Sequence, residues 1–310
     1  MIPTSIATLA QETTLMNRIL KTQSEILKTQ NQISTQKVAE RYSEIASDSG
    51  RLVNLKSAQT RLDRFMINND LVKIRLQTME QHTSQIFDIA TEFRTLLVSA
   101  LNTDTNAEDI VINGVAADRM GMVASLLNVE IEGRHLFSGM KTDTPPVDLN
   151  DAAFLPPPAA YPSIAADTSY YQGDNATLVA HVEENTDISY GIRADASGFE
   201  KLIRSLHMAK TTVTSPLDRS RLEDALRLSE EAINEISDIR TNIGGSLKAV
   251  DLANTVHSDA LLKVQENISN IENVDVAAAM TKLSNDQLHL EASFMVLARL
   301  SSLSLVNFLR

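Results

Sequence analysis

The sequence predicts a mainly α protein. Long helices from the N- and C-terminal regions are expected to pair into an antiparallel, coiled-coil-like helical rod, with a small β-rich insert in the middle of the chain. Near both ends, apolar residues recur at spacings of three and four over long stretches. Aromatic residues make up only 4% of the chain, Trp is absent and there are 10 Gly in 310 residues, a composition typical of long helices. Six of the eight Pro lie between Pro145 and Pro162, which places the interruption of the helical pattern in the middle.

The first predicted helix runs from Thr4 to about Gln36. Its apolar stripe is wide enough to face two neighbours, and charges are few because Gln and Thr fill most other positions. Such an uncharged outer face suits packing between subunits, although Gln-rich helices in contact with solvent have the same composition. The period is lost over residues 38–50, and the turn-like sequence SDSG at 47–50 predicts a break there.

A second long helix is predicted over residues 55–100, and a further helix over residues 110–133. Within the first of these, apolar residues alternate at spacings of three and four, interrupted by the polar residues Asn69 and Thr83. Polar residues on such a seam fix its register at some cost in stability. This repeat is the N-terminal half of the predicted rod.

Residues 139–196 depart from the helical pattern. Prolines disfavour helix in the first part. Three short runs rich in β-branched and aromatic residues follow at 169–171, 176–182 and 187–193, separated by polar turns, and predict a small β-rich insert. Residues 101–200 also hold 16 Asp and Glu against 4 Lys and Arg, while the two ends are nearly neutral. The acidic middle is either a solvated region between self-associating ends or simply rich in loops.

Helix is expected again after this insert. Ser197 and Glu200 have the spacing of a capping box, and Ser215 with Pro216 reads as the start of the longest helical repeat, Leu222 to Ile271. The repeat loses phase over residues 271–276 and resumes in a last helix that is apolar nearly all round from residue 300. Such a helix cannot stay alone in water.

These patterns divide the chain into three parts. They are terminal helices for polymer assembly, residues 1–50 and 272–310; a helical rod domain, residues 51–138 and 197–271; and an outward-facing Pro- and Tyr-rich β insert, residues 139–196. The candidate assembly residues of the terminal helices are Leu9, Met16, Ile19, Leu20, Ile26, Leu27, Ile33, Leu283, Leu290, Phe294, Leu297, Leu303 and Phe308. The candidate seam within the rod comprises Val72, Met79, Ile86, Phe93, Leu226, Ile233, Ile236, Leu247, Leu261, Val264 and Ile268.

Several classes of function find no support in the sequence. The six His are scattered without metal-ligand spacing, Cys is absent, and no phosphate-binding loop, nucleophile elbow or His-Glu-x-x-His motif is present. We therefore expect no enzyme, cofactor or metal. The net charge of −12 argues against a nucleic-acid partner, and no run approaches the roughly 18 apolar residues of a membrane span. The first residues, MIPTS, lack the basic and apolar segments of a Sec-type signal peptide.

What remains is assembly through the terminal helices. Their outer apolar stripes stay uncovered after the two ends pair, and a subunit with such a surface gains by giving it to copies of itself. Head-to-tail contacts of this kind make open helical polymers or rings. The expected first partner is therefore a second copy of the chain.

Particular segments also resemble the flagellin superfamily. The C-terminal run VQENISNIENVDVA at 264–277, followed by a helix ending in LSLVNFLR at 303–310, is similar to the terminal signature of that superfamily. The run EGRHLFSG at 132–139, leading into KTDTPP at 141–146 and YYQGD at 170–174, resembles the hook-associated protein 3 branch. Residues 38–49, VAERYSEIASDS, depart from the usual family turn.

The resemblance implies a structural, non-enzymatic adaptor at the junction of flagellar hook and filament, outside the cell. It implies export without a cleavable signal peptide through the flagellar type III apparatus, and polymerisation through the terminal helices. The implied partners are hook-associated protein 1, flagellin and a cytosolic export chaperone. Flagellin itself is the nearest alternative, and the small Pro- and Tyr-rich insert favours the adaptor. A type III needle-tip or translocator protein is a further alternative, against which the terminal signature argues.

Overall fold

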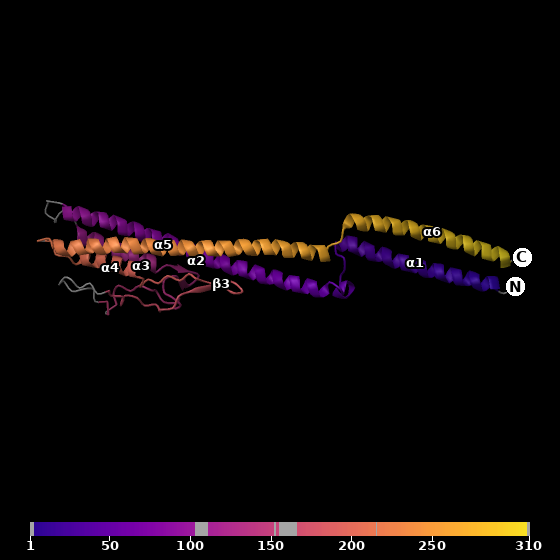
Figure 1. The fold of residues 1–310 in the computed structure, drawn as a ribbon, viewed down its shortest axis with the longest axis horizontal. Helices are drawn as coiled ribbons and strands as arrows, with labels where there is room; N and C mark the ends of the chain where they lie inside the picture. Colours follow the sequence, from indigo (N-terminus) through magenta and orange to yellow (C-terminus); the bar gives the residue numbers. More distant parts are fainter. Residues whose placement is uncertain (1–2, 103–110, 152, 155–165, 215, 309–310) are drawn as a thin grey trace. The chain divides into compact units, whose positions relative to one another are not determined.

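The computed structural model describes residues 3–102, 111–151, 153–154, 166–214 and 216–308, with side chains from residue 10 to residue 299 within these ranges. The described residues confirm a mainly α fold with a small β region in the middle of the chain (Figure 1). The helices are α1 (Pro3–Thr35), the 3-10 helix η1 (Tyr42–Ile45), α2 (Ser49–Asn102), α3 (Ile112–Leu127), α4 (Ser197–Lys210), α5 (Arg219–Glu272) and α6 (Val276–Phe308). The strands are β1 (Glu130–Ile131), β2 (Arg134–His135), β3 (Val179–Glu183) and β4 (Thr186–Ser189).

The chain forms two compact units, which are described separately. The first comprises Met1–Arg61 and Ala260–Arg310, and the second Leu62–Asp259. The predicted division into terminal helices, rod domain and outward-facing insert remains a prediction.

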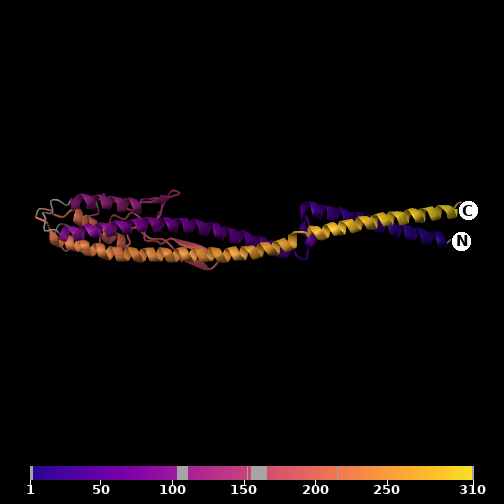
Figure 2. The ribbon, with the colours of Figure 1, turned by 90° about the horizontal axis from the view of Figure 1, so that it is seen from above.

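In the first unit, α1 and α6 lie side by side and run in opposite directions, so that the start of α1 and the end of α6 lie at the same end (Figures 1 and 2). Lys282 donates to the Glu25 carboxylate at 3.1 Å across the pair. At the other end of the two helices, the backbone N–H of Val38 donates to the Glu272 carbonyl at 2.8 Å. Two helices far apart in the sequence are thus held together at both places.

Burial along α1 and α6 follows a seven-residue repeat. In α1 the side chains withdrawn from solvent include residues 12, 15, 19, 22, 26, 29 and 33, and in α6 they are residues 276, 279, 283, 286, 290, 293 and 297. Spacings of three and four keep these positions on one face of each helix. The two faces form the contact between α1 and α6, which we call the terminal seam.

In the second unit, α2 and α5 form the same kind of antiparallel pair. Arg240 of α5 donates to Glu80 of α2 at 2.8 Å, and Arg94 of α2 donates to Glu230 of α5 at 3.0 Å. Residue numbers therefore rise along one helix as they fall along the other. These exposed or half-exposed ion pairs contribute little stability each, so burial of the apolar face between the helices holds the pair together.

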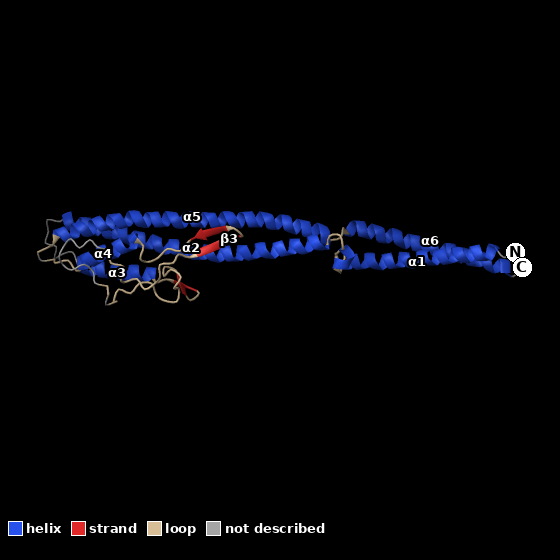
Figure 3. Cartoon of the chain, turned by 60° about the horizontal axis from the view of Figure 1, so that its bottom comes forward, coloured by secondary structure: helices blue, strands red, loops and turns tan. Residues whose placement is uncertain are grey.

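Helices α3 and α4 pack against each other and extend this core (Figure 3). Strands β3 and β4 form an antiparallel hairpin in which Val179 pairs with Ser189. One carbonyl, that of Val182, accepts hydrogen bonds from Asn69 Nδ2 of α2 at 3.3 Å and from His257 Nε2 of α5 at 2.8 Å. Asn69, which interrupts the helical repeat of α2, and the buried His257 of α5 therefore anchor the hairpin to both long helices.

The segments around Gly139 and Tyr170 are tied together by backbone contacts. Asp174 N–H donates to the Ser138 carbonyl at 3.1 Å, and Tyr170 donates its hydroxyl to the Ala194 carbonyl at 3.0 Å. Gly139 has a φ of +72°, and a Cβ there would lie 2.9 Å from the Asp174 carbonyl oxygen, so only Gly fits. Burial raises the pKa of the Tyr170 hydroxyl well above its ordinary value. Two segments that carry the family resemblance thus form one packed joint.

The predicted capping box at the start of α4 is wrong. Ala196 is the N-cap residue, and Ser197 is already the first residue of the helix. The Glu200 carboxylate accepts instead from Arg204 at 3.0 Å and from the backbone N–H of Asp167 at 3.1 Å. Burial raises the pKa of Glu200, and the Arg204 charge opposes that change. The Glu200 carboxylate can be buried in the core because the charged side chain of Arg204 lies one turn along the same helix.

The predicted start of α5 is also displaced. The helix begins at Arg219, and Asp218 Oδ1 accepts from the Arg221 N–H at 3.1 Å, which is the hydrogen bond of an N-cap. Pro216 precedes this turn, and Ser215 lies outside the described residues. Asp is as good an N-cap as Ser, so the local sequence offered two competing starts.

The β region differs from the prediction at two places. The run at 169–171 forms only an isolated bridge, between Val147 and Tyr171. The other two predicted runs overlap β3 and β4. The helix predicted to reach Gly133 ends at Leu127, and β1 and β2 follow as a minimal hairpin whose turn has positive φ at Gly133. Strands of two residues are too short to give a sequence period.

His207 of α4 predicts a pH dependence of stability. Burial lowers its pKa from 6.5 to about 4, and the nearby charges of Lys210 and Arg221 act in the same direction. The unfolded chain therefore takes up this proton first, and the free energy of unfolding falls as pH drops from 6.5 to about 4. One proton gives a slope of at most about 1.4 kcal/mol per pH unit, and less here because the side chain is partly exposed.

Urea unfolding followed by circular dichroism between pH 7.5 and 4.5 measures this slope. His207→Gln should make the pH dependence shallower, and the same substitution at the exposed His289 of α6 is the matched control. Equal slopes for His207→Gln and the wild-type chain would show that His207 is not the group responsible.

Candidate assembly surface

The terminal seam is only partly apolar. One of its two layers holds Ile19, Ile26 and Ile33 from α1, with Glu12 at its end, and Val276 and three Leu from α6. The other layer is polar or small at most positions and consists of Leu15, Thr22, Thr29, Ala279, Asp286 and Ser293. A two-helix contact with half of its seam apolar buries little surface compared with the paired α2 and α5. The remaining apolar side chains of α1 and α6 then decide what else these helices do.

The structure separates the predicted assembly residues into two groups. Ile19 and Ile26 are buried and Ile33, Leu283, Leu290 and Leu297 are half-buried in the terminal seam, so they pack within the chain itself. Met16, Leu20, Leu27 and Phe294 remain exposed, with exposed fractions of 44%, 56%, 63% and 45%. The side chains of Leu9, Leu303 and Phe308 lie outside the described residues.

Further exposed apolar side chains of α6 were not among the predicted residues. They are Met280, Leu288, Met295 and Val296. Leu288 and Met295 are seven residues apart, so the same repeat that marks the seam could have identified them. Together with Met16, Leu20, Leu27 and Phe294 they make up the exposed terminal face.

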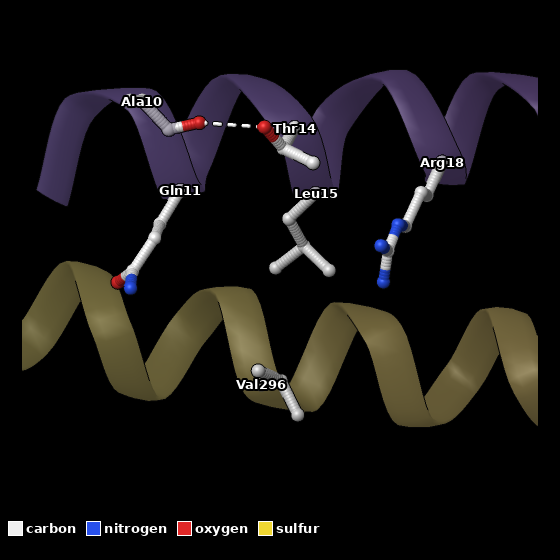
Figure 4. Close-up of a pocket in the computed structure, with 6 residues that line it drawn as sticks. All are labelled: Ala10, Gln11, Thr14, Leu15, Arg18 and Val296. Atoms are coloured by element: carbon white, nitrogen blue, oxygen red, sulfur yellow. Dashed lines mark hydrogen bonds between the residues drawn. The ribbon is translucent and has the colours of Figure 1, made fainter. Parts of the chain in front are cut away.

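A hollow opens beside the terminal seam near its free end (Figure 4). Its volume is about 440 Å³, and its lining residues are Ala10, Gln11, Thr14, Leu15, Arg18 and Val296. In Figure 4 the side chains of Gln11, Leu15 and Arg18 extend from α1 towards α6, and Thr14 turns back to donate to the Ala10 carbonyl at 2.8 Å. The two helices therefore do not fill the space between them here.

Opposite charges hold the other end of the terminal helices. Glu272, at the end of α5, accepts from Lys37 at 2.7 Å and also contacts Lys56 of α2. These two lysines lower the pKa of the Glu272 carboxyl. Across the terminal seam, Lys282 lowers the pKa of the Glu25 carboxyl. This end of the terminal helices is held by specific ion pairs, whereas the exposed terminal face is apolar.

The predicted seam residues of the rod lie where α2 and α5 pair, with different degrees of burial. Val72, Met79, Ile86, Phe93 and Ile236 are buried, and Leu226, Ile233 and Leu247 are half-buried against the same core. Leu261, Val264 and Ile268 are half-buried in the first unit. The predicted seam does not include the buried Ala225, Ala232 and Ala253 of α5. Each of them lies three residues after another buried position. Small apolar residues give a weak signal, because Ala is common on every face of a helix.

Within the described part of the chain, no group of three or more His, Asp and Glu is placed to hold a metal ion. Nor does any helix there combine the length and apolar content needed to cross a membrane. The arrangement offers surfaces for protein contact, and the exposed terminal face lies on the helices that the sequence predicts to assemble.

Comparison with known families agrees with this arrangement. The family model for the bacterial flagellin N-terminal helical region matches residues 6–142, and that for the bacterial flagellin C-terminal helical region matches residues 226–309. Together the two models cover well over half of the chain, and they lie on the two sides of the β insert.

Curated relatives match along nearly the whole length. Flagellar hook-associated protein 3 of Escherichia coli (strain K12) is 23% identical over 94% of this chain and 95% of its own, and the same protein of Salmonella typhimurium is 21% identical over 95% and 96%. Among solved structures, flagellar hook-associated protein 3 of Legionella pneumophila shares the fold, with a TM-score of 0.57, 12% identity and coverage of 70% of this chain and 98% of that one. The chain belongs to the flagellin family of bacterial flagellar structural proteins, and its full-length similarity is to hook-associated protein 3.

Proposed function

We propose that this protein is the junction adaptor between the flagellar hook and the flagellar filament. The observation that carries the proposal is the match to hook-associated protein 3 over 94% of this chain and 95% of that relative, so that terminal helices and insert are matched together. The proposed mechanism is mechanical coupling. A short ring or helical layer of subunits presents one end to the hook and the other to the filament.

The exposed terminal face supports self-association as the way in which this layer forms. Leu20 and Leu27 of α1 are more than half exposed, and so are Met280 and Leu288 of α6. Burying a fully exposed side chain of this kind contributes roughly 1.5–3 kcal/mol, so covering what remains exposed of each contributes about half of that. Copies of the chain that cover these residues mutually gain that energy in every repeat of the layer.

The other proposed partners are those that the resemblance to hook-associated protein 3 implies. The adaptor would contact hook-associated protein 1 on the hook side and flagellin on the filament side, with the β insert facing outward. Export through the flagellar type III apparatus, without cleavage, would bring it outside the cell. A cytosolic export chaperone would cover the apolar last helix before export, because that helix would otherwise associate prematurely.

Flagellin is the alternative within the same family, since both kinds of subunit polymerise through paired terminal helices. The chain's similarity over almost its full length to hook-associated protein 3 supports the adaptor. The two functions differ in where the subunit is found and in what is lost without it.

Deletion of the gene in the source bacterium tests the adaptor function. We expect hooks without filaments by electron microscopy, and flagellin subunits released into the culture medium, because filament subunits would have no layer on which to assemble. Complementation with the intact gene is the control. Normal filaments in a strain without a second copy of the gene would contradict the proposal, and loss of flagellin itself from cells and medium would favour the flagellin alternative.

Charges placed on the exposed terminal face should block assembly. Leu20→Glu with Leu27→Glu removes two exposed apolar side chains and puts two carboxylates where copies are expected to meet. With about 1.5–3 kcal/mol lost for the two side chains together, we expect at least tenfold fewer filaments per cell.

Asn17→Glu with Gln30→Glu is the matched control, because it adds the same two charges to exposed polar positions of the same helix. The level of each variant in the culture medium shows whether export has occurred. Normal filament numbers with the Leu variant, or equal losses with the control, would show that the apolar side chains are not the contact.

A further inference from the structure

Helix α6 carries a repeat that suits pairing with a copy of itself. Val276, Leu283, Leu290 and Leu297 are seven residues apart and share the buried layer of the terminal seam. Leu repeated at this interval on one face is a strong signal for parallel pairing of identical helices. In an assembly whose subunits are related by rotation about an axis, equivalent helices run in the same direction. Something must therefore favour α1 over a second α6.

Asp286 occupies the other layer of the same seam, between Leu283 and Leu290. Its position faces α1 in the seven-residue repeat, and its Oδ2 atom is buried without a hydrogen-bond partner among the described residues. The nearest cation along the helix, Lys282 one turn earlier, donates to Glu25 of α1 at 3.1 Å. Burying a carboxylate oxygen without a donor costs stability, so an acidic residue at a position where Ala279 and Ser293 are small and neutral calls for a reason.

The partner that α1 offers at this level is Thr22. Glu25 of α1 contacts Lys282 of α6. Thr22 lies three residues before Glu25 and Asp286 lies four residues after Lys282, so in this antiparallel pair Thr22 and Asp286 lie at the same level. The Thr22 hydroxyl donates to the Arg18 carbonyl of its own helix at 3.0 Å, so it adds no charge to the layer. Against α1, the Asp286 layer holds one carboxylate and a neutral side chain.

We propose that Asp286 is the residue that determines the pairing specificity of the seam face of α6, by excluding a parallel pair in which this face packs against the same face of α6 of another copy. In a parallel pair of α6 helices, the two Asp286 side chains meet in the same layer. Lys282, one turn before Asp286, is the only Lys or Arg among residues 276–298. Two carboxylates brought together in one seam repel each other, which opposes closure of that pair. This repulsion is absent from the pair with α1, which offers the neutral Thr22 at the same level.

The inference rests on the proposed function only for the benefit that it assigns to Asp286. That benefit is to stop subunits from pairing through the seam faces of their last helices in place of the correct contacts. Its test uses purified protein and does not depend on the flagellum. Asn at this position should allow α6–α6 pairing to an intermediate extent, because two Asn side chains can hydrogen-bond to each other in a parallel helix pair.

A single cysteine reports the pairing directly, since the chain has no Cys of its own. Ser293 lies seven residues after Asp286 on the same face of α6, so Ser293→Cys places a thiol where a parallel α6 pair would bring two thiols together. On mild oxidation of the full-length chain, we expect little disulfide-linked dimer with Ser293→Cys alone. Adding Asp286→Leu should raise the dimer fraction at least fivefold, and Asp286→Asn should give a smaller rise.

Glu291→Leu in the same cysteine background is the matched control, because it adds an equal apolar side chain at an exposed position outside the seam. Circular dichroism of each variant verifies that helix content is unchanged. A dimer fraction for Asp286→Leu equal to that of the parent would overturn the proposal, even if the variant is more stable, since α1 alone would then hold α6. An equal rise with Glu291→Leu would overturn it too, by showing that any added apolar side chain suffices.

Discussion

Antiparallel packing of helices that are far apart in the sequence is the constraint on which each unit depends. In the second unit, α2 and α5 bury a continuous apolar face, and the β3–β4 hairpin, α3 and α4 are all attached to that core. In the first unit, α1 and α6 are paired along the terminal seam. Because neither partner of a pair can bury its apolar face alone, the N- and C-terminal segments must meet before either unit is complete.

The two pairs differ in how fully they satisfy that constraint. Leu76, Met79, Ile86 and Leu97 of α2 are completely withdrawn from solvent, whereas the terminal seam has one apolar and one largely polar layer. Thr29 is buried there with no partner for its hydroxyl among the described residues. An incomplete seam, an open hollow and an exposed apolar face on the same two helices are consistent with contacts that are completed by other subunits.

The helices and their antiparallel pairing could be predicted from the sequence because the hydrophobic repeat is long and regular. The period alone could not show which of two apolar stripes on α1 packs inside the chain, since Ile19 and Leu20 are equally apolar and only the position of α6 separates them. The start of α5 was missed because Ser215 and Asp218 are both good N-caps. Asn69 is predicted as a polar break in the seam, but its partner, the Val182 carbonyl, lies 113 residues away in the sequence, and that carbonyl also accepts from His257, 75 residues away, so neither contact leaves a local signal.

The central claim is that the protein occupies the junction between hook and filament, and its position on intact flagella tests that claim most directly. Antibody raised against residues 62–259 and coupled to gold can be located by electron microscopy on flagella isolated with their hooks. The account predicts one narrow band of label per flagellum, where the hook ends and the filament begins. Label repeated along the whole filament would contradict it and would identify the chain as the filament subunit.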